Sequence, residues 1–249
     1  MNEEERYLFD LQGCLVVEDV LSQAEIDELT HLMRPQFDAE PNNEDIYTQR
    51  FGGFLQLESD AFRNLLNHPR IMPYLKELIG DRFRLDHAYG IVMRKGNLGL
   101  NLHGGGTPYN PSQYYVCRDG QMYNGLTVVS WALTDMLPGH GGFCCIPGSH
   151  KSNFSCPPQL KAVKDAPECM KGIHQKAGDV AIFTEALTHG TLPWEADHPR
   201  LSILVKYSPG HASWSQKQYP DEMRAQMNSE DQRLLLEPPY VHGRKAVVD

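Results

Sequence analysis

Two histidines far apart in the chain, followed by one arginine, are the residues best suited to chemistry. His103 lies in the segment LNLHGGG and His189 in LTHGTLPW, and Arg200 comes eleven residues after His189. Iron(II) that binds oxygen takes two histidines and a carboxylate in many oxygenases, which leaves open coordination positions. A guanidinium can bind a carboxylate through two charge-assisted hydrogen bonds. These residue types could therefore serve a metal ion and an acidic small molecule, although a lone histidine is more often structural.

The bulk properties exclude several classes of protein. A formal net charge of −9 and the absence of any basic run argue against a nucleic-acid polymer as partner. No apolar stretch approaches the roughly 20 residues that cross a bilayer, and the start MNEEERYLFD lacks the features of a signal peptide. The six cysteines form no C-x-x-C pair, which favours reduced thiols. We expect a cytoplasmic protein without membrane contact, and its oligomeric state cannot be read from the sequence.

The elements that must position these residues change in kind along the chain. Residues 11–20 predict a strand, and Ser22 with Glu25 forms a capping box for a helix that Pro35 should end. Residues 60–80 predict two more helices, and residues 221–236 a surface helix. Between them lie short runs typical of strands, which favour a sandwich or open barrel: HAYGIVMR, GLTVVSWALTD, GGFCCIPG, GDVAIFTE and RLSILVKYSPG.

Two longer segments carry a resemblance to a known family. GCLVVEDVLSQAEIDEL and VVSWALTDMLPGHGGFCCIPGSHKSN resemble the N-terminal strand and helix and the central signature of the phytanoyl-CoA dioxygenase family of iron(II)/2-oxoglutarate oxygenases. The resemblance covers nearly the whole chain, and each piece alone is weak while the combination is specific. It implies a mainly β fold, a double-stranded β-helix of the jelly-roll or cupin type with flanking N- and C-terminal helices. We expect a single domain over residues 1–249.

The same resemblance assigns the site. It implies His103 and His189 as iron ligands and Arg200 as the partner of the distal carboxylate of 2-oxoglutarate, with O2 as the second co-substrate. Thr191 and Ser202 would help to bind 2-oxoglutarate, and Trp131 would line the pocket, although an aromatic residue in a strand is equally explained by packing. The substrate would be a small molecule with an unactivated C–H bond.

Gly105 departs from the family pattern, which places Asp or Glu two residues after the first histidine. Related oxygenases with Gly or Ala there resemble halogenases, in which chloride takes the place of the carboxylate and restores its charge. This departure slightly favours a halogenase. Water, or a carboxylate such as Asp86 or Asp119, would instead complete the site of a hydroxylase. A third alternative is a non-catalytic cupin-like binding module.

Other polar motifs have simpler interpretations. His140 and His150 lie in turns between strands and are expected to be structural. The HGGG tract resembles the oxyanion loop of some esterases, but the chain has no G-x-S-x-G motif to supply the nucleophile. Five residues near the expected ligands could shape a substrate pocket or only pack their loops: Gln113, Tyr114, Tyr115, Arg118 and Trp194.

Overall fold

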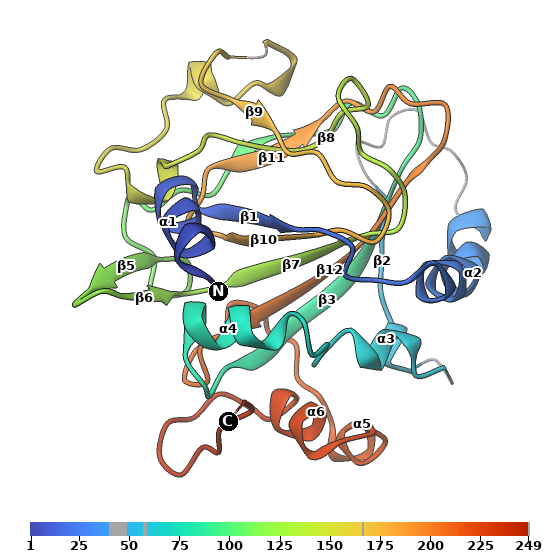
Figure 1. The fold of residues 1–249 in the computed structure, drawn as a ribbon, viewed down its shortest axis with the longest axis vertical. Helices are drawn as coiled ribbons and strands as arrows, with labels where there is room; N and C mark the ends of the chain where they lie inside the picture. Colours follow the sequence, from blue (N-terminus) through green and yellow to red (C-terminus); the bar gives the residue numbers. More distant parts are fainter. Residues whose placement is uncertain (40–48, 57–58, 166, 249) are drawn as a thin grey trace.

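Two antiparallel β-sheets form the body of the protein, as the computed structural model shows (Figure 1). The model describes residues 1–39, 49–56, 59–165 and 167–248. The large sheet has the order β1-β10-β7-β12-β3-β2, and the small sheet the order β4-β11-β8-β9. The strands of the large sheet are β1 (Cys14–Val17), β2 (Gln49–Phe51), β3 (Arg84–Met93), β7 (Thr127–Ala132), β10 (Val180–Thr184) and β12 (Arg200–Ser208). The small sheet contains β4 (Leu100–His103), β8 (Gly142–Cys145), β9 (Lys171–Gly172) and β11 (His189–Leu192).

The central strands of the large sheet are buried on both faces, since every residue of β7, β10 and β12 is buried. In β12 the odd-numbered residues from Leu201 to Tyr207 join the main hydrophobic core. Because side chains alternate along a strand, the even-numbered residues Arg200 to Lys206 face the other way, toward the small sheet. The polar residues of β12 are therefore on its inner face.

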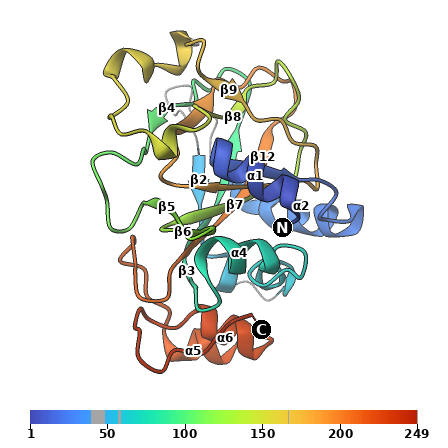
Figure 2. The same cartoon turned by 60° about the vertical axis from the view of Figure 1, so that its left-hand side comes forward.

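Helices cover the outer face of the large sheet (Figure 2). They are α1 (Glu3–Gln12), α2 (Gln23–Ala39), α3 (Ala61–Asn64) and α4 (Met72–Ile79). Leu29 and Met33 of α2 and Leu75 and Leu78 of α4 lie at most 1% exposed in the same core as the odd-numbered residues of β12. A second core cluster includes Phe143 of β8 and Phe183 of β10, whose stacked rings join the two sheets.

Three local predictions need correction. The strand predicted over residues 11–20 is shorter: β1 covers only Cys14–Val17, and Leu11 and Gln12 end helix α1, whose Asn2–Glu5 capping box was missed. Helix α2 continues through Pro35 to Ala39, although an interior proline removes one hydrogen bond and crowds the carbonyl of the preceding turn; buried Leu29 and Met33 anchor the turns before it. The predicted C-terminal helix is two short helices, α5 (Asp221–Ala225) and α6 (Glu230–Leu235), and Leu234 and Leu235 are buried rather than on the surface.

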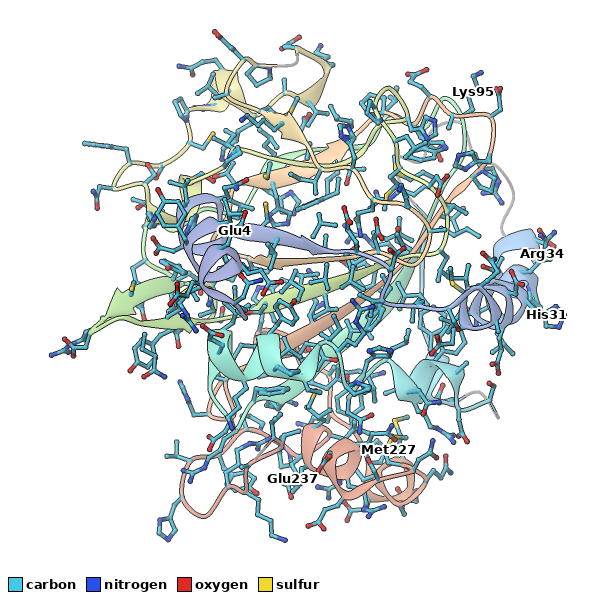
Figure 3. All side chains as sticks on the ribbon, in the orientation of Figure 1. Glu4, His31, Arg34, Lys95, Met227 and Glu237 are labelled. Atoms are coloured by element: carbon cyan, nitrogen blue, oxygen red, sulfur yellow. The ribbon has the colours of Figure 1, made fainter. Side chains whose placement is uncertain are left out.

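A separate hairpin, β5 (Tyr115–Arg118) and β6 (Gln121–Asn124), projects from the sheets (Figure 1). Charged side chains such as Arg34 and Lys95 lie at the periphery of the molecule (Figure 3). Within the described ranges, no helix combines the length and apolar character needed to cross a membrane.

Candidate metal centre

The two histidines chosen from the sequence meet across the small sheet. Strands β4 and β11 run antiparallel, and His103 and His189 are partners in their register. The centroids of the two imidazole rings are 4.3 Å apart. The pairing of β4 with β11 thus brings together two residues, His103 and His189, that lie far apart in the sequence.

Each imidazole is oriented by a backbone carbonyl. His103 Nδ1 lies 3.1 Å from the carbonyl oxygen of Asn101, and His189 Nδ1 lies 2.7 Å from that of Leu187. A carbonyl oxygen can only accept a hydrogen bond, so Nδ1 carries the proton and Nε2 keeps its lone pair. Burial lowers the pKa of His189 to about 4, so this ring is neutral at pH 7, as a metal ligand must be.

Both histidines open onto a cavity of about 320 Å³ between the sheets. This volume is within the range of small-molecule sites. Polar and aromatic side chains make up most of the lining, together with a few aliphatic ones. The lining includes Arg50, His87, Tyr89, Ile91, Leu100, Gln113, Ser130, Phe143, Phe183, Glu185, Thr191, Arg200, Leu204, Lys206 and Trp214.

Arg200 is a buried cation without an anionic partner among the described residues. It is 2% exposed, its Nη1 contacts only the sulfur of Met93 at 3.4 Å, and its Nε has no hydrogen-bond partner. Burial lowers the pKa of Arg200 to about 10, and the group stays charged at pH 7. Isolated buried charges are costly, so this guanidinium fits a carboxylate of a bound molecule.

Glu185 is a buried carboxylate in the same cavity. Its Oε1 accepts a hydrogen bond from Lys206 Nζ at 2.5 Å, and its Oε2 lies 3.9 Å from His189 Nε2. Burial alone would raise the pKa of Glu185, but the interaction with His189, which is protonated below its own pKa, and the charge and hydrogen bond of Lys206 outweigh it and lower the pKa to about 2. Glu185 is therefore an anion at pH 7.

Comparison with known proteins identifies the family. Residues 9–202 match the model of the phytanoyl-CoA dioxygenase family. The chain belongs to this family. It is an iron(II)/2-oxoglutarate-dependent oxygenase, with the mainly β, double-stranded β-helix fold expected from the sequence.

One curated relative and several solved structures are similar to this chain, and the solved structures show the same fold. The dioxygenase af480 of Aspergillus fumigatus is 26% identical over 239 residues, which cover 90% of this chain and 73% of that protein. HygX from Streptomyces hygroscopicus, solved with nickel and 2-oxoglutarate, has a TM-score of 0.78 at 23% identity, covering 90% of this chain and 94% of HygX. A second HygX structure also contains hygromycin B, with a TM-score of 0.73 at 24% identity and coverage of 86% and 89%. The carbocyclase SnoK from nogalamycin biosynthesis has a TM-score of 0.65 at 18% identity, covering 85% of each chain.

The residues expected to bind the co-substrate of this family divide into two groups. Thr191 lines the cavity with Arg200, and Ser202 lies on the same face of β12 as Arg200, with its buried hydroxyl unpartnered in the described structure. Trp131 needs correction: it lies in the main core on the outer face of β7, with its ring against His68. Its neighbour Ser130 lines the cavity instead.

The two carboxylates considered for the family's vacant ligand position do not line the cavity. Asp86 is buried behind the cavity wall, where it accepts hydrogen bonds from Ser208 and from the backbone of Trp214 and Ser215 and lies 2.7 Å from Nδ1 of the lining residue His87. Asp119 lies in the β5–β6 turn with its side chain 91% exposed. In the part of the chain that the structure describes, no three His, Cys, Asp or Glu side chains already close around one point as a complete metal-binding group.

The other motif residues have mixed positions. His150 is structural, as expected, since its Nε2 hydrogen-bonds the carbonyl of Asp10. Gln113 lines the cavity, whereas Trp194 is buried in the core between the sheets. Sequence reasoning missed Glu185 and Lys206, although the signal for Glu185 was available: it follows the buried strand β10 in phase with the inward-facing Phe183.

Proposed function

We propose that the protein uses iron(II), 2-oxoglutarate and O2 to insert oxygen into an unactivated C–H bond of a small molecule. One observation carries the proposal: two imidazoles with free Nε2 atoms share a cavity with a buried guanidinium that lacks an anionic partner in the described structure. The imidazoles fit a divalent metal, and the guanidinium fits the far carboxylate of a dicarboxylic acid. These are the two groups that the family requires.

The residues of the chain divide the work of binding. His103 and His189 would hold iron, whose bound form supplies O2 activation coupled to decarboxylation of 2-oxoglutarate. Arg200, with Thr191 and Ser202, would fix the orientation of 2-oxoglutarate. In the overall reaction one oxygen atom of O2 leaves in succinate, the other enters the product, and CO2 is released. Phe183 and other apolar lining residues limit the access of water.

The substrate side of the cavity favours a polar small molecule. Arg50, His87, Gln113 and Trp214 line it, so both charged and stacking contacts are available. The cavity must also accommodate 2-oxoglutarate, which leaves room for only part of a larger substrate. HygX with its bound hygromycin B and the carbocyclase SnoK also point to small-molecule chemistry.

Halogenation is the second candidate, and it rests on Gly105. In a halogenase the missing side chain would leave room for chloride beside the metal. Gly105 does not line the cavity here, and its φ of 113° directs a Cβ toward Thr188 Oγ1, 3.3 Å away. The ionised Glu185 inside the cavity would also repel chloride. Both features support oxygen transfer over halogenation.

The decisive experiment measures succinate and product together. Purified protein is given Fe(II), 2-oxoglutarate and O2, with a panel of polar small molecules, in buffers with and without chloride. We expect succinate from 2-oxoglutarate and a product that gains one oxygen atom whether or not chloride is present. A product in which chlorine replaces hydrogen, formed only with chloride, would establish the halogenase instead.

Variants separate catalysis from simple binding. His103→Ala and His189→Ala should abolish succinate formation. His140→Ala is the matched control, because His140 packs against Trp194 and His198 away from the cavity and should keep the activity. If iron-loaded wild-type protein forms no succinate with or without substrate, the chain is a binding module and the oxygenase proposal fails.

A further inference from the structure

We infer that Glu185 supplies the carboxylate ligand of the iron site, and that Lys206 positions it. The inference rests on the proposed function, since it concerns the same metal. In place of the ligand that the family pattern would put at position 105, the carboxylate comes from the turn between β10 and β11. Neither residue was a candidate in the sequence.

The glycine tract after His103 cannot supply this ligand. Strand β4 ends at His103, and Gly104 and Gly105 have φ values of 76° and 113°, so the alternation of strand side chains does not continue past the histidine. A Cβ on Gly104 would lie 2.8 Å from the carbonyl oxygen of Glu185 and 2.7 Å from that of Leu187. The tract therefore packs directly against the turn that carries Glu185, and Glu185 is the carboxylate that this turn brings to the cavity.

The position of Glu185 follows from strand β10. Phe183 points inward between the sheets, and Glu185 continues the same alternation two residues later. Its backbone N–H is fixed by the carbonyl of Leu126 at 2.9 Å. Four residues further on, His189 begins β11, so both residues reach one cavity from the two ends of a single turn.

The distances are compatible with a shared ion. Two donors bound to one metal ion at about 2.1 Å each can be no more than about 4.2 Å apart, and about 3 Å apart when adjacent in an octahedron. Glu185 Oε2 and His189 Nε2 are 3.9 Å apart. A rotation of the carboxylate that brings Oε2 about 1 Å closer to His189 Nε2 would place these two donors at adjacent positions of one ion.

Lys206 gives Glu185 the support that metal ligands usually have. Its ammonium group, which is 10% exposed, donates to Oε1 and leaves Oε2 for the metal. Ligating carboxylates are commonly held in this way by a second hydrogen bond, and loss of such a partner lowers metal affinity about 10–100-fold. The alternative, an ion pair that only stabilises the fold, does not explain why both groups line the cavity beside the imidazoles.

The test measures metal binding, not activity. Anaerobic calorimetry with Fe(II) gives the affinity, and the visible spectrum of the Co(II)-loaded protein reports the ligand set. Glu185→Gln should weaken Fe(II) binding at least about 100-fold and change the Co(II) spectrum, and Lys206→Met should weaken it about 10–100-fold. Asp179→Asn is the matched control, because it removes a buried carboxylate beside the other end of β10, where the side chain of Asp179 accepts hydrogen bonds from the backbone N–H groups of Asp19 and Lys176.

The outcomes separate the inference from the proposed function. Wild-type affinity and spectrum in a folded Glu185→Gln protein would overturn the inference alone. Failure of the wild-type protein to bind Fe(II) would overturn the proposed function as well. If Glu185→Gln does not fold, Glu185→Asp decides: it keeps the charge beside Lys206 but withdraws the oxygen from the metal, so unchanged affinity in that variant also overturns the inference.

Discussion

Replacing Arg200 by methionine should have opposite effects on stability and on co-substrate binding. The wild-type guanidinium is 2% exposed and its only hydrogen-bond acceptor among the described residues is the sulfur of Met93. Exchange of a buried charged group for an apolar side chain of similar volume often stabilises a protein by about 1–4 kcal/mol. We therefore expect the free energy of unfolding of the ligand-free Arg200→Met protein to rise within this range.

Binding of 2-oxoglutarate should fall steeply in the same variant. A bidentate contact with a carboxylate contributes two hydrogen bonds of about 1.5–3 kcal/mol each. Since about 1.4 kcal/mol is a factor of ten, losing both raises Kd at least about 100-fold. Arg200→Lys, which keeps the charge and loses the fork, should show a smaller increase. Calorimetry on Ni(II)-loaded protein measures Kd, and urea unfolding measures stability.

Arg84 provides the control for the stability argument. It is also buried, but its Nε donates to the carbonyl of Glu237, and its Nη1 donates to Ser213 and lies 3.7 Å from Asp86. Arg84→Met breaks these contacts and should destabilise the protein. If Arg200→Met destabilised the ligand-free protein as much as Arg84→Met does, or bound 2-oxoglutarate within threefold of wild type, the assignment of Arg200 as an unpaired co-substrate cation would be refuted.

Three further predictions concern the surroundings of the site. Burial lowers the pKa of His150 to about 4, below its unfolded value of 6.5, so its contribution to stability is complete above pH 6.5 and is lost as the pH falls toward 4. Between pH 7.5 and 5 the free energy of unfolding of the wild type, measured with urea, should therefore fall by about 2 kcal/mol more than that of His150→Gln. Equal losses in the two proteins would contradict this. Asp86→Asn should cost about 2–4 kcal/mol and speed amide exchange at Trp214, whose N–H donates to Asp86; unchanged exchange would count against this role. Gly105→Asp should cost about 1–3 kcal/mol through its positive φ and should not restore Fe(II) binding to Glu185→Gln; restored calorimetric binding would show that position 105 does reach the metal.

The sequence predicted strands β3, β7, β8, β10 and β12, but not the short strands β4 and β11 that carry His103 and His189. The structure shows why other details also escaped it. Trp131 was assigned to the pocket, but every residue of β7 is buried, so no polar alternation marked which face is inward. Pro35 was expected to end a helix that tertiary packing instead extends. The partnership of Glu185 with Lys206 could not be predicted, because it depends on how β10 and β12 lie against their common neighbour β7.

The glycine residues after His103 and the carboxylate of Glu185 are structurally linked, because they lie against each other. A side chain at Gly104 would collide with the carbonyl oxygen of Glu185, so the close approach of this tract to the turn requires glycine. With the glycine tract packed in this way, the acidic side chain beside the two imidazoles in the cavity is that of Glu185. At position 105 a side chain would meet only Thr188 Oγ1, at 3.3 Å, but the φ of 113° is a conformation that L residues rarely adopt. The absence of a carboxylate two residues after His103 therefore does not by itself indicate a halide site, because Glu185, in the turn between β10 and β11, brings a negative charge to the same cavity.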